Sequence, residues 1–228
     1  MKNDSTYMLC KKIFTQYKEG SKLLNENLLA RKYRVSRSSL RESLKILKSK
    51  GVIKGKQKTG TFIASYKNLN YFDKDILNWS EGSKYAYEIR KYFIETLMMF
   101  EPVIAYYCAK HIDEKNKNEL NIIYNNLSES VENKNSKDII CYDLAFHKKI
   151  FINCNNPILL PLFGLITHIL ELNFRRLKRE SKDYIKNWKK IYLHQHKDLR
   201  DAIIKNHPVK AKQKMTLIIS TIKKTFIL

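Results

Sequence analysis

The sequence predicts a mainly α-helical protein, in which a small domain of three helices and a hairpin precedes a larger all-helical domain. Two observations support this fold class. Apolar residues recur at helical spacing along most of the 228 residues, and strand-like segments occur only between residues 52 and 64. Chain breakers are scarce, with six Gly and four Pro in the whole chain. Because 43% of the residues are hydrophobic, the chain can bury a substantial core.

The first 65 residues contain the three expected N-terminal helices. The first spans about residues 5–17, and its apolar stripe consists of Tyr7, Met8, Ile13 and Phe14. Asn25 offers an N-cap oxygen to a short second helix, whose expected inward residues are Leu28, Leu29 and Ala30. Ser36 caps a third helix that runs to about Lys50 and ends at Gly51. The apolar face of this third helix consists of Leu40, Leu44 and Leu47.

A basic hairpin is expected directly after the third helix. Two short strands, residues 52–54 and 61–64, flank a glycine-bounded turn that is rich in lysine. A helix pair followed by such a hairpin is the plan of a winged helix-turn-helix. We place this DNA-binding domain at residues 1–66 and a linker without strong periodicity at residues 67–84.

The remaining chain, residues 85–228, predicts an all-α bundle of six or so helices. The candidate helices cover residues 85–111, 114–131, 137–152, 158–179, 182–205 and 209–225. Asn and Pro residues separate several of these segments and mark the expected turns. Consecutive long helices without strands favour a helix bundle as the architecture of this domain.

Positive charge is concentrated near the N-terminus. The chain carries 44 Lys and Arg against 22 Asp and Glu, a formal net charge of +22. Residues 1–65 hold 16 of the basic residues and only 4 of the acidic ones. Such a density is typical of a surface that binds phosphates, although lysine is also a common solubilising residue. The count alone therefore leaves open whether the charge is a nucleic-acid surface or a solvated coat.

Cysteine usage and hydropathy predict a soluble cytoplasmic protein with no membrane partner. The cysteines are widely spaced and form no CxxC pair, so we expect neither a disulfide framework nor a structural zinc knuckle at Cys10, Cys108, Cys141 and Cys154. The N-terminus lacks the apolar core of a signal peptide. The most apolar stretch, residues 157–170, is too short to cross a bilayer.

The third helix carries side chains suited to reading DNA. Arg37 and Arg41 lie four residues apart, so both project from one helical face and can enter the major groove together. A bidentate Arg on guanine is worth about 1–3 kcal/mol. Short hydroxyls suited to phosphate oxygens are provided by Ser36, Ser38 and Ser39. The alternative is an exposed amphipathic helix whose arginines are incidental.

The N-terminal domain resembles the GntR family of bacterial regulators. The matching residues, in order, are Gly20 to Leu23, Asn25-Glu26, Leu29-Ala30, Val35 to Arg37, Leu40 to Glu42, Leu44, Leu47, Gly51-Val52 and Gly60 to Ile63. The resemblance implies that the two arginines read or clamp the operator, the three serines hold phosphates, and Gly60 and Thr61 shape the wing tip. The expected DNA-binding residues are Ser36, Arg37, Ser38, Ser39, Arg41, Lys58, Gly60 and Thr61.

The chain departs from this family in the second helix. Where members often carry Arg directly after the helix-two Glu, this chain has Asn27. A phosphate or base contact of that helix is therefore lost or replaced, with Arg31 and Lys22 as the candidate replacements.

The helical part resembles the FadR-type (FCD) effector domain. The matching residues are Phe100-Glu101-Pro102, Ala105, Cys108-Ala109, Asp143 to His147, Asn156-Pro157, His196 and Ala202-Ile203. Residues 72–79 resemble the lead-in segment of members that answer to sugar acids. Asp143 and His147 are one helical turn apart and so share a face. With His196 from another helix, they supply three protein ligands for a divalent ion and leave positions for water or a ligand carboxylate.

The resemblance implies one divalent metal ion (Zn, Ni or Mn) and a pocket for a small organic or sugar acid. The expected effector pocket contains Asp143, His147, His196 and Arg175. The family's fourth metal ligand, a further His, is replaced here by Ile218, and its frequent Arg four residues before Glu-Pro is replaced by Leu97. Possible substitutes are His168 and His207, whereas His194 lies nearly opposite His196 on the helix. Without the resemblance, Asp143 and His147 are equally compatible with a buried hydrogen-bonded pair or an exposed couple.

Three functions remain open at this point. The favoured hypothesis is a ligand-responsive transcription regulator, with repression the commoner family outcome, that binds a palindromic operator as a homodimer and is not an enzyme. The second is a ligand-independent DNA-binding regulator whose degenerate effector pocket serves only as a dimerisation scaffold. The third is a metal-dependent hydrolytic enzyme in which Asp143, His147 and His196 activate water, although no acid/base partner or nucleophile motif accompanies them.

Overall fold

The computed structural model describes residues 4–133, 136–164, 166–168, 171 and 182–227. The chain divides into two compact units, Met1–Ile89 and Arg90–Leu228, and the described part of each is largely helical. The predicted mainly α fold class is confirmed. Among the described helices, none is both long enough and apolar enough to cross a membrane.

The N-terminal unit begins with a helix-turn-helix and its hairpin. The helices are α1 (Asp4–Gln16), α2 (Glu26–Tyr33) and α3 (Arg37–Ser49), and the antiparallel strands are β1 (Ile53–Lys56) and β2 (Gly60–Ile63). Asn25 and Ser36 are the N-caps of α2 and α3, as predicted, and accept hydrogen bonds from the backbone N–H groups of Leu28 and Ser39. The expected wing is thus present.

Two side chains of this unit differ from the predicted core. Met8 and Leu28 are largely exposed, whereas Leu9 and Cys10 are buried with Ile13 and Phe14. The inward face of α1 is therefore shifted by about one residue from the expected stripe, because α1 must face α3 on one side and the following segment on the other.

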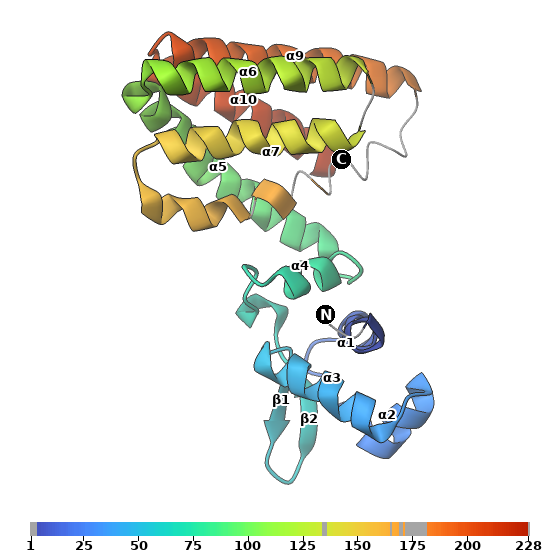
Figure 1. Ribbon diagram of the computed structural model, residues 1–228. Coiled ribbons are helices and arrows are strands. Elements are labelled where there is room, and N and C mark those ends of the chain that lie inside the picture. The colour runs from blue at the N-terminus through green and yellow to red at the C-terminus, as the bar shows by residue number, and fades with distance from the viewer. Residues whose placement is uncertain (1–3, 134–135, 165, 169–170, 172–181, 228) are drawn as a thin grey trace. The chain divides into compact units, whose positions relative to one another are not determined.

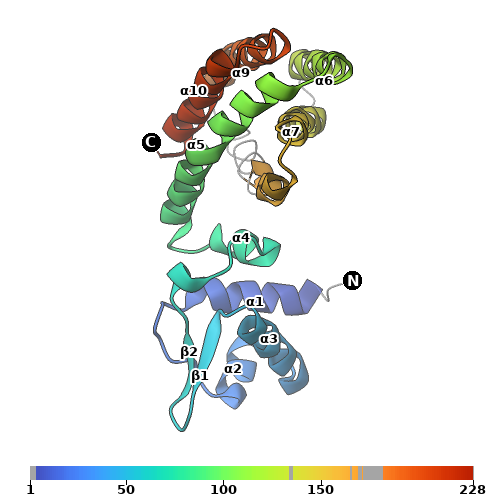
Figure 2. The ribbon, with the colours of Figure 1, turned by 90° about the vertical axis from the view of Figure 1, so that its left-hand side faces the viewer.

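The segment expected as a linker, residues 67–84, folds onto the N-terminal unit. It contains the short helix α4 (Lys74–Ser80), which contacts α1, after a 3-10 turn at Tyr66–Asn68 (Figure 2). Trp79 of α4 is 1% exposed, and its ring centroid lies 5.8 Å from that of Tyr7 and 6.1 Å from that of Phe14. The core of the N-terminal unit therefore includes a side chain that lies beyond the wing.

The described helices of the second unit form a bundle. They are α5 (Ala86–His111), α6 (Glu114–Glu132), α7 (Ser136–Asn153), α9 (Lys182–Ile204) and α10 (Pro208–Ile227). Figure 1 shows α6 beside α7 and α9, and α9 packs against α10. The expected helix at 158–179 begins instead as a 3-10 helix, Pro157–Leu162, and much of its remainder lies outside the described residues.

We expect Trp79→Ala to lower the unfolding free energy of the N-terminal unit by about 3–5 kcal/mol, because it removes a buried indole and leaves a cavity. Phe72→Ala is the control, since Phe72 is 61% exposed in the same segment, and its effect should stay within about 0.5 kcal/mol. Hydrogen exchange of the α1 and α3 amides, followed by mass spectrometry, measures both effects. Unchanged exchange in Trp79→Ala would show that α4 is not part of this core.

Candidate DNA interface and metal centre

The first turns of α3 present the predicted DNA-reading side chains. Arg37, Ser38 and Arg41 are exposed, whereas Ser39 is half-buried. The Ser36 Oγ atom caps α3 and lies 2.9 Å from Ser38 Oγ. The two arginines share one face of α3, and the uncapped N–H groups of a helix N-terminus favour an anion. This end of α3 can therefore bind phosphates and base edges together.

An ion pair between the two helices of the motif holds Arg41. Its Nε–H donates to Glu26 Oε2 over 2.8 Å, and this hydrogen bond together with the negative charge of Glu26 raises the pKa of Arg41. Glu26 is the first residue of α2, so the contact crosses from α2 to α3. Because the contact engages Nε, the terminal Nη1 and Nη2 nitrogens keep N–H donors that can bind a guanine edge. The sequence suggested no role for Glu26.

The wing tip depends on backbone conformations that favour glycine. Gly60 has φ +114°, and a Cβ built on it would lie 2.9 Å from Lys22 Cε. Lys58 also has positive φ, at 60°, and is exposed at the turn. Thr61 pairs with the segment before α2, because its carbonyl accepts the Leu23 N–H over 2.8 Å. Lys22, one candidate replacement for the missing helix-two arginine, therefore lies at the wing.

In the second unit, Asp143, His147 and His196 come together in a buried cluster. Asp143 and His147 lie on α7 and His196 on α9, and each side chain is almost fully covered. One ligand atom from each residue lies within 4.8 Å of the others. A carboxylate and two imidazoles are the donor set preferred by Zn²⁺ and related divalent ions. Asp143 and His147 are thus a buried set with His196 and not an exposed couple.

The outer nitrogen of each imidazole is bound by an acceptor. His196 Nδ1 lies 2.8 Å from the carbonyl oxygen of Tyr192, which can only accept, so this nitrogen carries the proton. His147 Nδ1 lies 3.1 Å from Glu101 Oε2, and a carboxylate there fixes the same tautomer. Both Nε2 atoms then present lone pairs to the cluster. Such outer partners are the usual means of orienting histidine ligands around a metal.

The inner atoms of the cluster are buried polar atoms that face one another. By ordinary hydrogen-bond geometry, both carboxylate oxygens of Asp143 and the Nε2 atoms of His147 and His196 are unpaired, although His196 Nε2 is 3.1 Å from Asp143 Oδ1 and the Tyr192 hydroxyl also interacts with Asp143. Two acceptors at this distance attract each other only when a proton or a metal ion lies between them. The residues present therefore fit a divalent ion.

The pKa values of Asp143 and His147 are shifted by their neighbours in the cluster. Burial alone would raise the pKa of Asp143, but the hydrogen bond and charge of His196, the charge of His147 and a hydrogen bond from Tyr192 lower it below its ordinary value. Burial would lower the pKa of His147, but the hydrogen bond and charge of Glu101, with Asp143, raise it. In the absence of metal, protons therefore supply the positive charge that the buried carboxylates require.

Among the described residues, the other predicted side chains contribute no ligand to this cluster. Ile218 on α10 and Leu97 on α5 are buried apolar side chains. His168 contacts the ring of Phe93, and His207 is exposed, so neither replaces the missing ligand. His194 is also exposed and pairs with Asp198, 3.7 Å away. Arg175, the predicted effector-pocket arginine, lies outside the described residues.

Glu101 is the site residue that the sequence did not assign. It lies on α5, 46 positions before His147, and is 2% exposed. A single acidic residue inside the apolar run Phe100-Glu101-Pro102-Val103 was the available signal, because a buried carboxylate requires a partner. Spacing could not reveal that this partner is His147.

Comparison with known proteins identifies the two units. The family profile "Bacterial regulatory proteins, gntR family" matches residues 9–63, and the profile "FCD domain" matches residues 93–221. The chain belongs to the GntR family of bacterial regulators and carries an FCD domain. The GntR and FCD resemblances predicted from the sequence are confirmed.

Relatives of this GntR-family chain align along most of its length. It is 27% identical to the Galactonate operon transcriptional repressor of Escherichia coli (strain K12), over 82% of this chain and 80% of that protein. It is 25% identical to the HTH-type transcriptional regulator YieP of the same organism, over 84% and 80%. A solved structure of Lar, described as controlling expression of the Listeria monocytogenes agr system, has the same fold, with TM-score 0.63, 12% identity and coverage of 99% and 96%.

These comparisons distinguish a transcription regulator from a hydrolytic enzyme. The relatives are named as transcriptional regulators and not as enzymes, so the chain is a DNA-binding regulator and the hydrolytic hypothesis is rejected.

Proposed function

We propose that this chain is a metal-dependent, ligand-responsive repressor that binds a palindromic operator as a homodimer in the cytoplasm. The observation that carries the proposal is the buried Asp143, His147 and His196 cluster, whose inner atoms are unpaired by ordinary hydrogen-bond geometry, in a chain that also presents exposed arginines on α3. The effector is a small organic or sugar acid. The name of the Galactonate operon repressor, a relative over most of the chain, supports a sugar acid in particular.

The proposed metal is Zn²⁺, Ni²⁺ or Mn²⁺, held by Asp143, His147 and His196. When bound, such an ion supplies positive charge and open coordination positions for the carboxylate and hydroxyl oxygens of an acid. Glu101 and the Tyr192 carbonyl hold the two imidazoles in the ligating tautomer. Effector binding would stabilise one arrangement of the bundle and so change operator affinity, because a ligand shifts an equilibrium by its differential affinity for the two states.

The proposed dimer contact is an apolar row on α5. Side chains at three- and four-residue spacing along this helix are exposed or half-exposed, and they are Tyr92, Thr96, Met99, Val103 and Tyr107. Four of these five side chains are large and apolar or aromatic, so the row is suited to pack against a second copy of itself about a two-fold axis. A palindromic operator requires the same two-fold symmetry. A dimer through this row would therefore explain both the exposed apolar side chains and the binding of a palindrome.

For the DNA interface, we expect Arg37→Ala and Arg41→Ala to lose specific operator binding while the fold is retained. Each lost guanine contact should cost about 1–3 kcal/mol. The operator is first obtained by selecting bound sequences from a random DNA pool, and affinities are then measured by gel-shift titration. Lys212→Ala removes the same charge from an exposed site in the second unit and should bind normally. Unchanged sequence preference in both arginine variants would exclude α3 as the reading helix.

For the metal centre, we expect Glu101→Gln to lower divalent-metal affinity about 10–100-fold, because the neutral amide oxygen that remains holds and polarises His147 more weakly than the carboxylate does. Ile218→His should raise the affinity by restoring a fourth ligand. Calorimetric titration of chelator-stripped protein with Zn²⁺, Ni²⁺ and Mn²⁺ measures both changes, with the exposed His194→Ala as control.

Metal analysis and a ligand screen separate this proposal from the ligand-independent alternative. If elemental analysis finds no ion in the native protein and none in Ile218→His, the metal site is refuted. A thermal-shift screen of organic and sugar acids, with and without each ion, should raise the melting temperature for one combination. Stabilisation by none would identify a ligand-independent regulator with a degenerate pocket.

For the dimer, we expect Met99→Glu to raise the dimer dissociation constant about tenfold or more, because the side chain is 76% exposed in the monomer and would bury a charge in the interface. Analytical ultracentrifugation measures the constant. Ile122→Glu is the control, since this residue is 58% exposed on α6 and should leave association unchanged. Equal dissociation constants for Met99→Glu and the wild type would place the interface elsewhere.

A further inference from the structure

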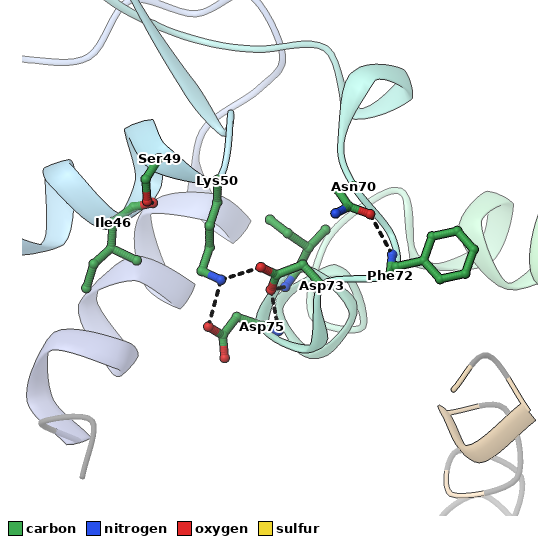
Figure 3. Close-up of polar contacts among 8 residues, drawn as sticks. Ile46, Ser49, Lys50, Asn70, Phe72, Asp73 and Asp75 are labelled. Atoms are coloured by element: carbon green, nitrogen blue, oxygen red, sulfur yellow. Dashed lines mark hydrogen bonds and ion pairs between the residues drawn. The ribbon is translucent and has the colours of Figure 1, made fainter. Parts of the chain in front are cut away.

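The end of the recognition helix is tied to α4 by a lysine between two aspartates. Lys50 follows α3, and its Nζ lies 2.5 Å from Asp73 Oδ2 and 3.0 Å from Asp75 Oδ2 (Figure 3). The three side chains are mostly covered, with exposures of 16%, 27% and 12% for Lys50, Asp73 and Asp75. We call these residues the Lys50 clamp.

The two carboxylate oxygens of Asp73 bind different groups. Oδ1 caps α4 by accepting the backbone N–H groups of Asp75 and Ile76 at 2.8 Å and 3.3 Å. Oδ2 binds Lys50. The same side chain therefore starts α4 and joins it to the end of α3, so the position of α4 is coupled to that of the recognition helix.

Lys50 is consequently not part of the DNA-binding surface, although it counts among the basic residues of the N-terminal segment. Burial acts to lower its pKa, but hydrogen bonds and charges of Asp73 and Asp75 outweigh burial and raise it. Its charge is satisfied inside the unit, and its Nζ lies 6.0 Å from the centre of the Trp79 ring. The clamp thus lies beside the apolar contact that anchors α4.

Trp79 and the Lys50 clamp constrain the position of α4 in different ways. Apolar burial of Trp79 stabilises docking but is non-directional. A charge held between two carboxylates depends on the positions of all three groups, so it fixes how the start of α4 lies against the end of α3. Helix α4 ends at Ser80 and α5 begins at Ala86, so only five residues separate the clamped helix from the start of the next helix.

We propose that the Lys50 clamp is a specificity-determining site that sets the half-site spacing read by the dimer. The proposal rests on the proposed function, in which two copies bind a palindrome. If the segment after the wing were a free tether, each winged helix could reach half-sites at many separations. With α4 held against α3, the rigid reading unit extends through α4, and one separation is favoured.

The test compares Lys50→Met with Lys48→Met, a matched exposed lysine two residues earlier in α3. Both variants of the full chain are titrated against a single half-site and against full operators whose half-sites are moved by up to four base pairs. Lys50→Met should bind the half-site within about twofold of wild type, but its preference for the native spacing should fall about tenfold. Lys48→Met should keep the wild-type spacing preference.

Two further variants keep the result interpretable if Lys50→Met unfolds the unit. Asp73→Asn retains an oxygen to cap α4 but loses the ion pair, so it should also broaden the accepted spacings. Lys50→Arg retains the charge and should restore the native preference. Faster hydrogen exchange of the α4 amides in Asp73→Asn, with unchanged exchange in α3, would support local release of α4.

The outcomes separate the clamp from the proposed function. A wild-type protein that binds full operators no better than a half-site at any spacing overturns the dimeric recognition of a palindrome, and the clamp proposal with it. A sharp wild-type spacing preference that persists in both Lys50→Met and Asp73→Asn overturns the clamp alone. Loss of preference in Lys48→Met to the same extent would also overturn it, because general charge removal would then be the cause.

Discussion

Burial of the Asp143 carboxylate is the constraint on which the arrangement of the C-terminal unit depends. An isolated carboxylate inside a protein is strongly disfavoured, so its neighbours must supply positive charge. His147 and His196 approach it from α7 and α9, and each is held from behind, by Glu101 of α5 and by the Tyr192 carbonyl. A shift of any of these three helices would leave a buried polar atom without its partner. The polar contacts of the cluster therefore depend on how α5, α7 and α9 pack.

Helix positions were predictable because periodicity and caps are local properties of the chain. The caps at Asn25 and Ser36 lie where the sequence placed them. Which residues face inward was less predictable in short helices, and Leu28 is exposed although it neighbours two buried residues. Helix α4 was missed because seven residues contain too few turns to show a period, and its stability depends on the docking of Trp79. That docking is a tertiary effect with no local signal.

The cluster of Asp143, His147 and His196 was only partly predictable, because part of it also depends on tertiary packing. Asp143 and His147 are one turn apart on a helix, so their shared face follows from sequence alone. His196 lies on another helix, and its inclusion needed the resemblance to the FCD domain. Glu101 and Glu26 act through partners far along the chain, His147 and Arg41, and no spacing rule connects them. Long-range polar contacts are set by packing and are visible only once the helices are assembled.

The replacement of the fourth ligand bears directly on how such a site could respond to an effector. A divalent ion with four protein ligands is nearly closed, whereas three protein ligands leave positions for exchangeable oxygen donors. With Ile218 and Leu97 apolar and buried, these two positions offer no polar group that could compete with an incoming acid for the ion. The same loss lowers the intrinsic affinity for the metal, so ion and effector would each be held more strongly in the presence of the other. By linkage, the metal would then be part of the signal as well as part of the scaffold.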